Sequence, residues 1–145
     1  MIVLRLAVWS AFLLPALWWS WQALHAPPEG LQLANGARLE WGECWFERPL
    51  WRPVHCGRFH TAPEPGASPE RFVLQVVYIP QWWWRRSGPP VQYIAGGPGG
   101  AAWLKPDEVS FWLDWSEQAG WPGDLVLYDQ RGVGLGQHQP ATERR

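Results

Sequence analysis

Two short apolar segments, each ended by a glycine-rich turn, constrain the fold of this chain more than any other feature. Residues 91–95 (VQYIA) run directly into GGPGG at 96–100, and residues 125–128 (LVLY) run into DQRGVG at 129–134. Between the two turns, residues 106–118 predict a helix, because proline and two acidic residues begin it and a glycine follows its end. Short apolar strands that alternate with a helix are typical of a parallel, doubly covered sheet. We therefore expect an α/β fold.

The preceding part of the chain contains one further clear strand. Residues 72–79 (FVLQVVYI) are rich in β-branched and aromatic side chains and are bounded by a proline, which predicts a strand. The tract 81–90 is expected to be a loop because of its glycine and prolines. Residues 31–70 predict irregular structure with only short extended pieces.

The glycine loop after the 91–95 segment is the first candidate site. Glycines at the carboxyl end of a strand let the backbone approach a ligand closely, and open α/β sheets bind ligands at that edge. Successive N–H groups of such a loop can converge on one anion. Gly96 and Gly97 are therefore candidate donors to a developing oxyanion. Taken alone, a glycine- and proline-containing loop after a strand is more often a plain tight turn.

The turn at 129–134 is read as structural. Gly132 and Gly134 allow a sharp exit from the sheet, and Asp129 and Arg131 can tie the turn by a charge-assisted hydrogen bond. The turn has neither the GxGxxG spacing nor the lysine of a phosphate-binding loop, which argues against a nucleotide site.

The order strand–GGPGG–helix–strand–DQRGxG resembles that of the α/β-hydrolases, and specifically the serine peptidases of the prolyl and tripeptidyl aminopeptidase-like family. That family has a GGPG loop after the third strand of its sheet and a DxRGxG turn after the fourth. Its exported members carry an upstream cysteine pair, and Cys56-Gly57 resembles their CG segment. The resemblance covers about residues 41–140. It implies the N-terminal part of an α/β-hydrolase sheet, with at least one covering helix, incomplete in this chain.

The resemblance also implies roles for the two motifs. The backbone N–H of Gly97, with Gly96 beside it, would stabilise the tetrahedral oxyanion, with the residue after the nucleophile supplying the other donor. Asp129 and Arg131 would shape the loop without taking part in catalysis. The implied reaction is peptide hydrolysis by acyl transfer, with a peptide or another small acyl compound as substrate.

Three features depart from the family pattern. Ala95 stands where cytosolic relatives often have His, and Gly136 stands where the family usually has Ser. The fold also needs Gly-x-Ser-x-Gly, then an acid, then a histidine, and His138 comes too early to be that base. No serine of the chain is flanked by glycines; the six are Ser10, Ser20, Ser68, Ser87, Ser110 and Ser116. We expect the triad to lie beyond Arg145, and the chain alone to be inactive and poorly soluble.

Two other functions stay open. One is a different α/β-hydrolase, such as an esterase, lactonase or epoxide hydrolase. The other is a non-catalytic, membrane-tethered binding module that uses some of the 14 tryptophans for carbohydrate or lipid. The module predicts residues 82–84 (WWW) exposed on a ridge, whereas the hydrolase predicts a loop over the sheet edge. A tryptophan-filled core is the simpler explanation of the composition.

Residues 1–26 are expected to lie outside the folded domain, which spans 27–145. A positive start, an uncharged apolar run and a proline-rich exit predict a signal peptide, while the length of the run and Trp18, Trp19 and Trp21 suit an uncleaved anchor at a membrane interface. Both place the domain outside the cytoplasm, in the periplasm or anchored to a membrane.

Cysteine and charge content complete the expectations. In an oxidising compartment Cys44 and Cys56 predict a disulfide, with two unrelated buried thiols as the alternative. Two sulfurs without histidines at ligand spacing predict no metal site, and nothing predicts a cofactor. With 12 basic and 13 acidic residues interspersed, no nucleic-acid partner is expected. Arg85 and Arg86 are expected in a solvated loop.

Overall fold

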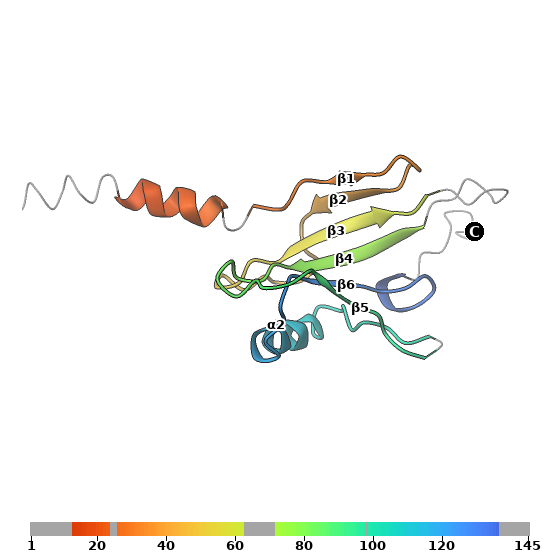
Figure 1. Ribbon diagram of the computed structural model, residues 1–145. Helices are drawn as coiled ribbons and strands as arrows, with labels where there is room; N and C mark the ends of the chain where they lie inside the picture. Colours follow the sequence, from red (N-terminus) through yellow and green to blue (C-terminus); the bar gives the residue numbers. More distant parts are fainter. Residues whose placement is uncertain (1–12, 24–25, 63–71, 98, 137–145) are drawn as a thin grey trace, which may run out of the picture.

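The computed structural model describes residues 13–23, 26–62, 72–97 and 99–136, which form a curled, mixed six-stranded sheet with one helix packed on it (Figure 1). The strands are β1 (Leu31–Gln32), β2 (Arg38–Gly42), β3 (His55–His60), β4 (Val73–Ile79), β5 (Val91–Tyr93) and β6 (Leu125–Tyr128). Helix α2 (Val109–Gln118) lies between β5 and β6 in sequence, and a short 3-10 helix, η1 (Gly134–Gly136), follows β6. The order across the sheet is β1-β2-β3-β4-β6-β5.

The expected fold class is wrong. Only β5 and β6 pair in parallel, and every other neighbouring pair of the sheet is antiparallel. Within the described ranges α2 and residues 13–23 are the only α-helices, so the molecule is mostly β and is not an α/β-hydrolase sheet with covering helices. The reason lies in the connections. β2, β3 and β4 each lie beside the strand that precedes them in sequence, so the chain reverses between them, whereas β5–α2–β6 has the helical crossover that parallel pairing needs.

The expected elements downstream of residue 72 are present with small shifts. β4 begins one residue after the predicted 72–79, β5 ends two residues before residue 95, and β6 has the predicted bounds. Helix α2 begins at Val109 instead of residue 106, because the amides of Glu108 and Val109 both donate to the carbonyl of Lys105 and form a separate turn. The short extended pieces expected within 31–70 are the three strands β1, β2 and β3, which pair into one sheet; residues 63–70 lie outside the described ranges.

The core lies between α2 and one face of the sheet. Val77 and Leu127 at the centre of the sheet have no exposed surface, and Trp112 of α2 is 2% exposed. The indole N–H of Trp112 donates to the carbonyl of Ala102 at 2.7 Å, which satisfies the one polar group that this large side chain buries. The helix therefore fastens the segment after β5 onto the sheet.

A disulfide joins Cys44 and Cys56, with their Cα atoms 5.0 Å apart, in agreement with the expectation from their spacing. Cys56 lies in the core on β3 and is 1% exposed. The bond therefore fixes the loop between β2 and β3, residues 43–54, to the centre of the sheet.

Residues 13–23 are helical and extend away from the end of the sheet where β1 begins (Figure 1). All eleven are exposed. A search of the described residues finds no helix of the length and apolar character that crossing a membrane requires. Residues 1–12 lie outside the described ranges, so the division of the chain at residue 26 stays a prediction.

Candidate functional site

The two glycine motifs meet at one edge of the sheet. β5 and β6 are parallel, with Val91 opposite Leu125 and Tyr93 opposite Leu127. Their carboxyl ends therefore lie side by side, and the loop 94–100 and the turn 129–136 both leave the sheet there (Figure 1). The sequence placed both motifs after strands, and the parallel pairing brings them together.

The backbone of the glycine loop has the conformation that only glycine adopts readily. Gly97 and Gly99 have φ values of 76° and 84°. A side chain in this left-handed region costs about 1–2 kcal/mol. Gly96 and Gly97 are exposed, and no described residue accepts a hydrogen bond from either amide. Pro98, the fifth member of the motif, lies outside the described residues. The loop thus presents two successive N–H groups at the strand tips.

Asp129 joins the glycine loop to the turn. Its carboxylate is buried, at 1% exposure, and accepts hydrogen bonds from the amide of Ala102 at 2.5 Å and from the amide of Leu135 at 2.8 Å. Ala102 lies two residues after Gly100, the last residue of the glycine loop, and Leu135 belongs to η1. The expectation that Asp129 shapes the turn thus extends to the exit of the neighbouring loop. It acts as a positioning residue.

The glycines of the turn are required for close contact. A Cβ at Gly134 would overlap the carboxylate of Asp129, and Gly134 and Gly132 have φ values of 51° and 83°. Gly136, where the resembled family usually has serine, is buried, and a Cβ there would overlap the carbonyl of Gln130. Its departure from the family pattern therefore fits the tight packing of this turn.

Arg131 points to a different neighbour. Its guanidinium lies 4.6 Å from the ring centroid of Phe72, which directly precedes β4. This cation–π contact ties the turn to the middle of the sheet. It was not anticipated, because nothing in the sequence relates two residues so far apart.

A cavity of about 450 Å³ opens between the segment 101–108, which follows the glycine loop, and the turn 129–134. Its walls come from the segment after the glycine loop, from the turn before α2 and from the buried carboxylate, and they consist of Ala101, Trp103, Leu104, Lys105, Glu108, Asp129 and Gly134. Trp103 is the only described residue other than glycine with a positive φ, at 54°. Strain of this kind is often found at binding sites.

The groups at this edge include no evident nucleophile. Ser116 is buried on α2 and donates to the carbonyl of Leu113 at 2.8 Å, and Ser87 precedes β5 at the opposite end of that strand. His138 lies outside the described residues. The described part of the chain contains no cluster of three His, Cys, Asp or Glu side chains that could hold a metal ion.

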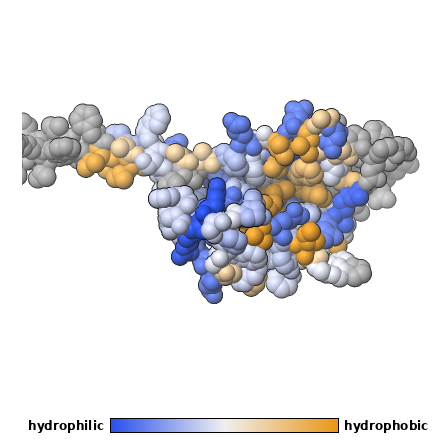
Figure 2. Space-filling view, viewed as in Figure 1, coloured by the Kyte–Doolittle hydropathy of each residue, from blue (hydrophilic) through white to orange (hydrophobic). Residues whose placement is uncertain are grey.

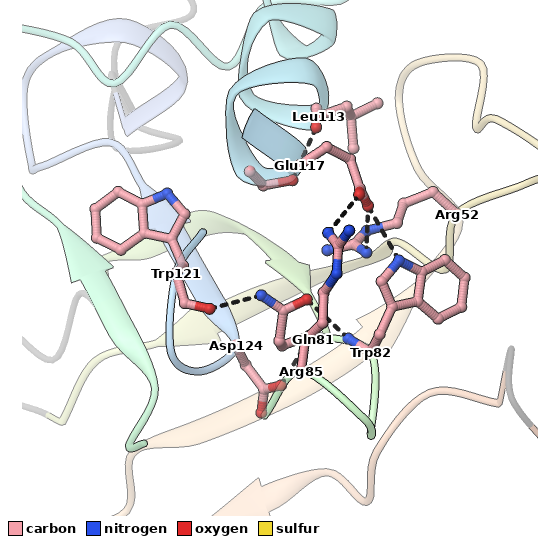
Figure 3. Close-up of polar contacts among 9 residues, drawn as sticks. Arg52, Gln81, Trp82, Arg85, Leu113, Glu117, Trp121 and Asp124 are labelled. Carbon is pink, nitrogen blue, oxygen red and sulfur yellow. Dashed lines mark hydrogen bonds and ion pairs between the residues drawn. The ribbon is translucent and has the colours of Figure 1, made fainter. Parts of the chain in front are cut away.

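A second polar cluster lies near the carboxyl end of α2 (Figure 3). Glu117 forms an ion pair with Arg52 at 2.6 Å, and it accepts hydrogen bonds from Arg85 at 3.0 Å and from the indole N–H of Trp82 at 3.1 Å. Burial lowers the pKa of Arg52, and the charge of Glu117 opposes that shift. The expectation that Arg85 lies in a merely solvated loop is therefore incomplete, because it is an ion-pair partner.

Asp124 organises the neighbouring loop in the same way. It accepts from the hydroxyl of Tyr78 at 2.8 Å, from the amide of Gln81 at 2.8 Å and from Arg86 at 2.5 Å. Burial and the hydrogen bond to Asp124 raise the pKa of Tyr78 to about 12. These contacts hold the segment 80–90 against the sheet, at the end of β5 opposite the glycine loop.

Comparison of the chain with protein-family models, with curated proteins and with solved structures finds no match in any of the three.

Proposed function

We propose that the loop containing Gly96 and Gly97 binds the oxyanion of an acyl-transfer reaction in an exported serine hydrolase, an aminopeptidase that acts on peptide N-termini. The observation that carries the proposal is the joint position of the two motifs. The glycine loop and the DQRGVG turn leave adjacent parallel strands at one edge and share the carboxylate of Asp129. The reaction type comes from the donors, and the peptide substrate comes from the family resemblance of the two motifs.

Backbone amides suit this role because their dipoles are fixed before the reaction begins. A preorganised donor that contacts the oxyanion lowers the barrier by about 3 kcal/mol. Preorganisation requires that the loop be held at both ends. Here β5 holds its start, and the hydrogen bond from Ala102 to Asp129 holds its exit. The exposed N–H groups of Gly96 and Gly97 lie between these two points. Neither donates to a described residue, so both are available to a ligand.

None of the six serines is the nucleophile in this reaction, and Asp129 is a positioning residue. The buried carboxylate already accepts two backbone hydrogen bonds, so it is committed to structure. A catalytic carboxylate would instead face a histidine or a substrate group. Loss of Asp129 should thus act through the position of the loop.

The test compares two glycines that differ in place but not in conformation. Gly97 and Gly120 both have left-handed φ values, 76° and 62°, and a Cβ at either would meet nothing within 4 Å. Gly120 lies just past the end of α2, away from the strand tips. Gly97→Ala and Gly120→Ala should therefore cost similar stability, and only the first should alter the loop.

The measurement is hydrolysis of aminoacyl p-nitroanilides by the protein purified through a tag from its native source. We expect Gly97→Ala to lower kcat by about a hundredfold with little change in KM, because the oxyanion forms only in the transition state. Gly120→Ala should retain the wild-type kcat. Equal losses in the two variants would remove the oxyanion role, and absence of hydrolysis that a fluorophosphonate blocks would remove the serine hydrolase.

A further inference from the structure

Large apolar side chains are exposed on two loops that flank the carboxyl end of α2. The loop 47–51 exposes Leu50 and Trp51, at 82% and 53%, and the loop 81–86 exposes Trp83 and Trp84, at 75% and 59%. We call these four residues the aromatic surface. Scattered exposed apolar residues are ordinary, but a group of them on adjacent loops marks an interaction site.

The ion pairs and hydrogen bonds of Glu117 fix the two loops relative to each other (Figure 3). Arg52 follows Trp51 directly, and its guanidinium lies between the carboxylate of Glu117, at 2.6 Å, and the ring of Trp82, at 5.1 Å. Trp84 stacks on Trp82, with ring centroids 5.0 Å apart. The exposed rings are therefore presented by a rigid base, which lowers the entropy lost when they bind.

The exposed helix 13–23 lies at the same end of the molecule. β1, β3, β5 and β6 run in one direction, so their amino ends share one end of the sheet with the loops that precede them. The helix leads into β1 at that end (Figure 1). Trp21 from the helix and Leu50 from the loop line one cavity of about 390 Å³.

Side chains of helix 13–23 itself are apolar and exposed. Leu14, Leu17 and Trp19 are 67%, 65% and 77% exposed, and Figure 2 shows an apolar patch on this helix beside paler, less apolar surface. Apolar side chains gathered on an exposed surface normally mark a site that protein or lipid covers. The neighbours of this helix at this end of the molecule are loops rich in tryptophan, the side chain that is enriched where lipid hydrocarbon meets water.

We propose that the aromatic surface docks on the interface of a phospholipid bilayer, together with helix 13–23, and so orients the folded part of the chain on the membrane. Two arginines stand beside the exposed rings: Arg85 and Arg86 keep 48% and 49% of their side chains exposed while paired with Glu117 and Asp124. Arg52 and Arg85 share the carboxylate of Glu117, and Arg86 pairs with Asp124, so these side chains carry one net positive charge. Insertion of the aromatic rings supplies most of the binding. The glycine loop then lies at the far ends of β5 and β6, directed away from the bilayer.

The first test is hydrogen exchange of the full chain, synthesised in the presence of phosphatidylcholine vesicles. We expect slower amide exchange in residues 47–52 and 81–86 than in detergent-free solution without vesicles, and unchanged exchange in residues 99–105 at the opposite end of β5. Protection confined to the first 26 residues would show a tether without docking and would overturn the proposal.

The second test uses two exposed tryptophans, one on the surface and one remote from it. Trp83→Ser removes a ring that is 75% exposed, and the control Trp103→Ser removes a ring that is 54% exposed after β5. Both variants keep residues 1–26, so the contribution of that segment cancels in the comparison. We expect Trp83→Ser to weaken partitioning into phosphatidylcholine vesicles by about tenfold, and Trp103→Ser to leave it unchanged.

Three outcomes would contradict the docking. Equal partitioning of the two variants would show that Trp83 does not insert. Binding that requires phosphatidylglycerol and disappears in high salt would make charge the cause in place of the rings. Protection of residues 81–86 by a soluble oligosaccharide, but not by vesicles, would assign the surface to carbohydrate.

Discussion

Asp129 occupies a position that no other side chain could fill with the same contacts. Its two oxygens accept from amides that belong to different segments, one 27 residues before it and one six residues after it. A carboxylate offers only acceptors, so it satisfies both donors at once. The absence of a Cβ at Gly134 leaves room for that carboxylate. The sequence indicated that Asp129 shapes a turn, but it gave no sign of Ala102 as a partner, because the hydrogen bond forms only once β5 and β6 pair.

Asp129→Asn should destabilise the fold. The amide group of asparagine places a donor where the carboxylate had an acceptor, so one buried backbone N–H, of Ala102 or Leu135, loses its partner. We expect a loss of about 1–3 kcal/mol in the free energy of unfolding. The control is Asp107→Asn, at an exposed position in the turn before α2, which should change stability by less than about 0.5 kcal/mol. Urea unfolding followed by tryptophan fluorescence measures both, and equal losses would show that the clamp is not stabilising.

Among the elements, the strands nearest the glycine motifs could be predicted and the antiparallel half of the sheet could not. β4 and β6 consist almost entirely of β-branched, leucine and aromatic residues, which marks them as strands. β3 reads HCGRFH, in which a glycine and polar residues on both faces obscure the period-two pattern. Its burial comes from neighbouring elements. Cys56 packs in the core that includes residues of α2, and the ring of Trp41 lies against Gly57. The local sequence does not specify which strands pair. The parallel sheet was expected from the one visible strand–helix–strand unit, and it holds only for β5 and β6.

The hydrogen bond between Tyr78, on β4, and Asp124, just before β6, makes the stability of the fold depend on pH. Tyr78 donates to Asp124, and burial together with this bond raises its pKa to about 12 from the ordinary 10.0. A pKa raised in the folded state means that the contribution to stability is complete below pH 10 and is lost as the pH rises toward 12. We expect the unfolding midpoint in urea to fall between pH 10 and pH 12. Tyr78→Phe should show a smaller fall over the same range, whereas Tyr128→Phe should fall like the wild type. If Tyr78→Phe and the wild type have parallel profiles, the hydroxyl does not titrate as described.

At the scale of the whole molecule, the sheet separates two surfaces. The amino ends of β3, β5 and β6 carry the aromatic surface, and the carboxyl ends of β5 and β6 carry the glycine loop and the Asp129 clamp. A strand of seven residues such as β4 spans about 23 Å, which sets the scale of their separation. The order of motifs in the sequence predicted that the two glycine turns belong together. Residues 82–84 precede β5 and the glycine loop follows it, so the two lie at opposite ends of that strand. The order of motifs could not predict that the loop 47–51 lies at the same end as residues 82–84, because that depends on how β3 pairs with β4.

The proposed oxyanion role requires that the amide of Gly97 point at the place where negative charge develops on a substrate carbonyl. The most direct measurement is a crystal structure of the native-source protein after inactivation by a fluorophosphonate, whose phosphoryl oxygen imitates that charge. We expect a hydrogen bond from the N–H of Gly97 to the phosphoryl oxygen, with the nitrogen and the oxygen about 2.7–3.1 Å apart. A phosphoryl oxygen bound by other donors, with Gly97 out of hydrogen-bond reach, would contradict it.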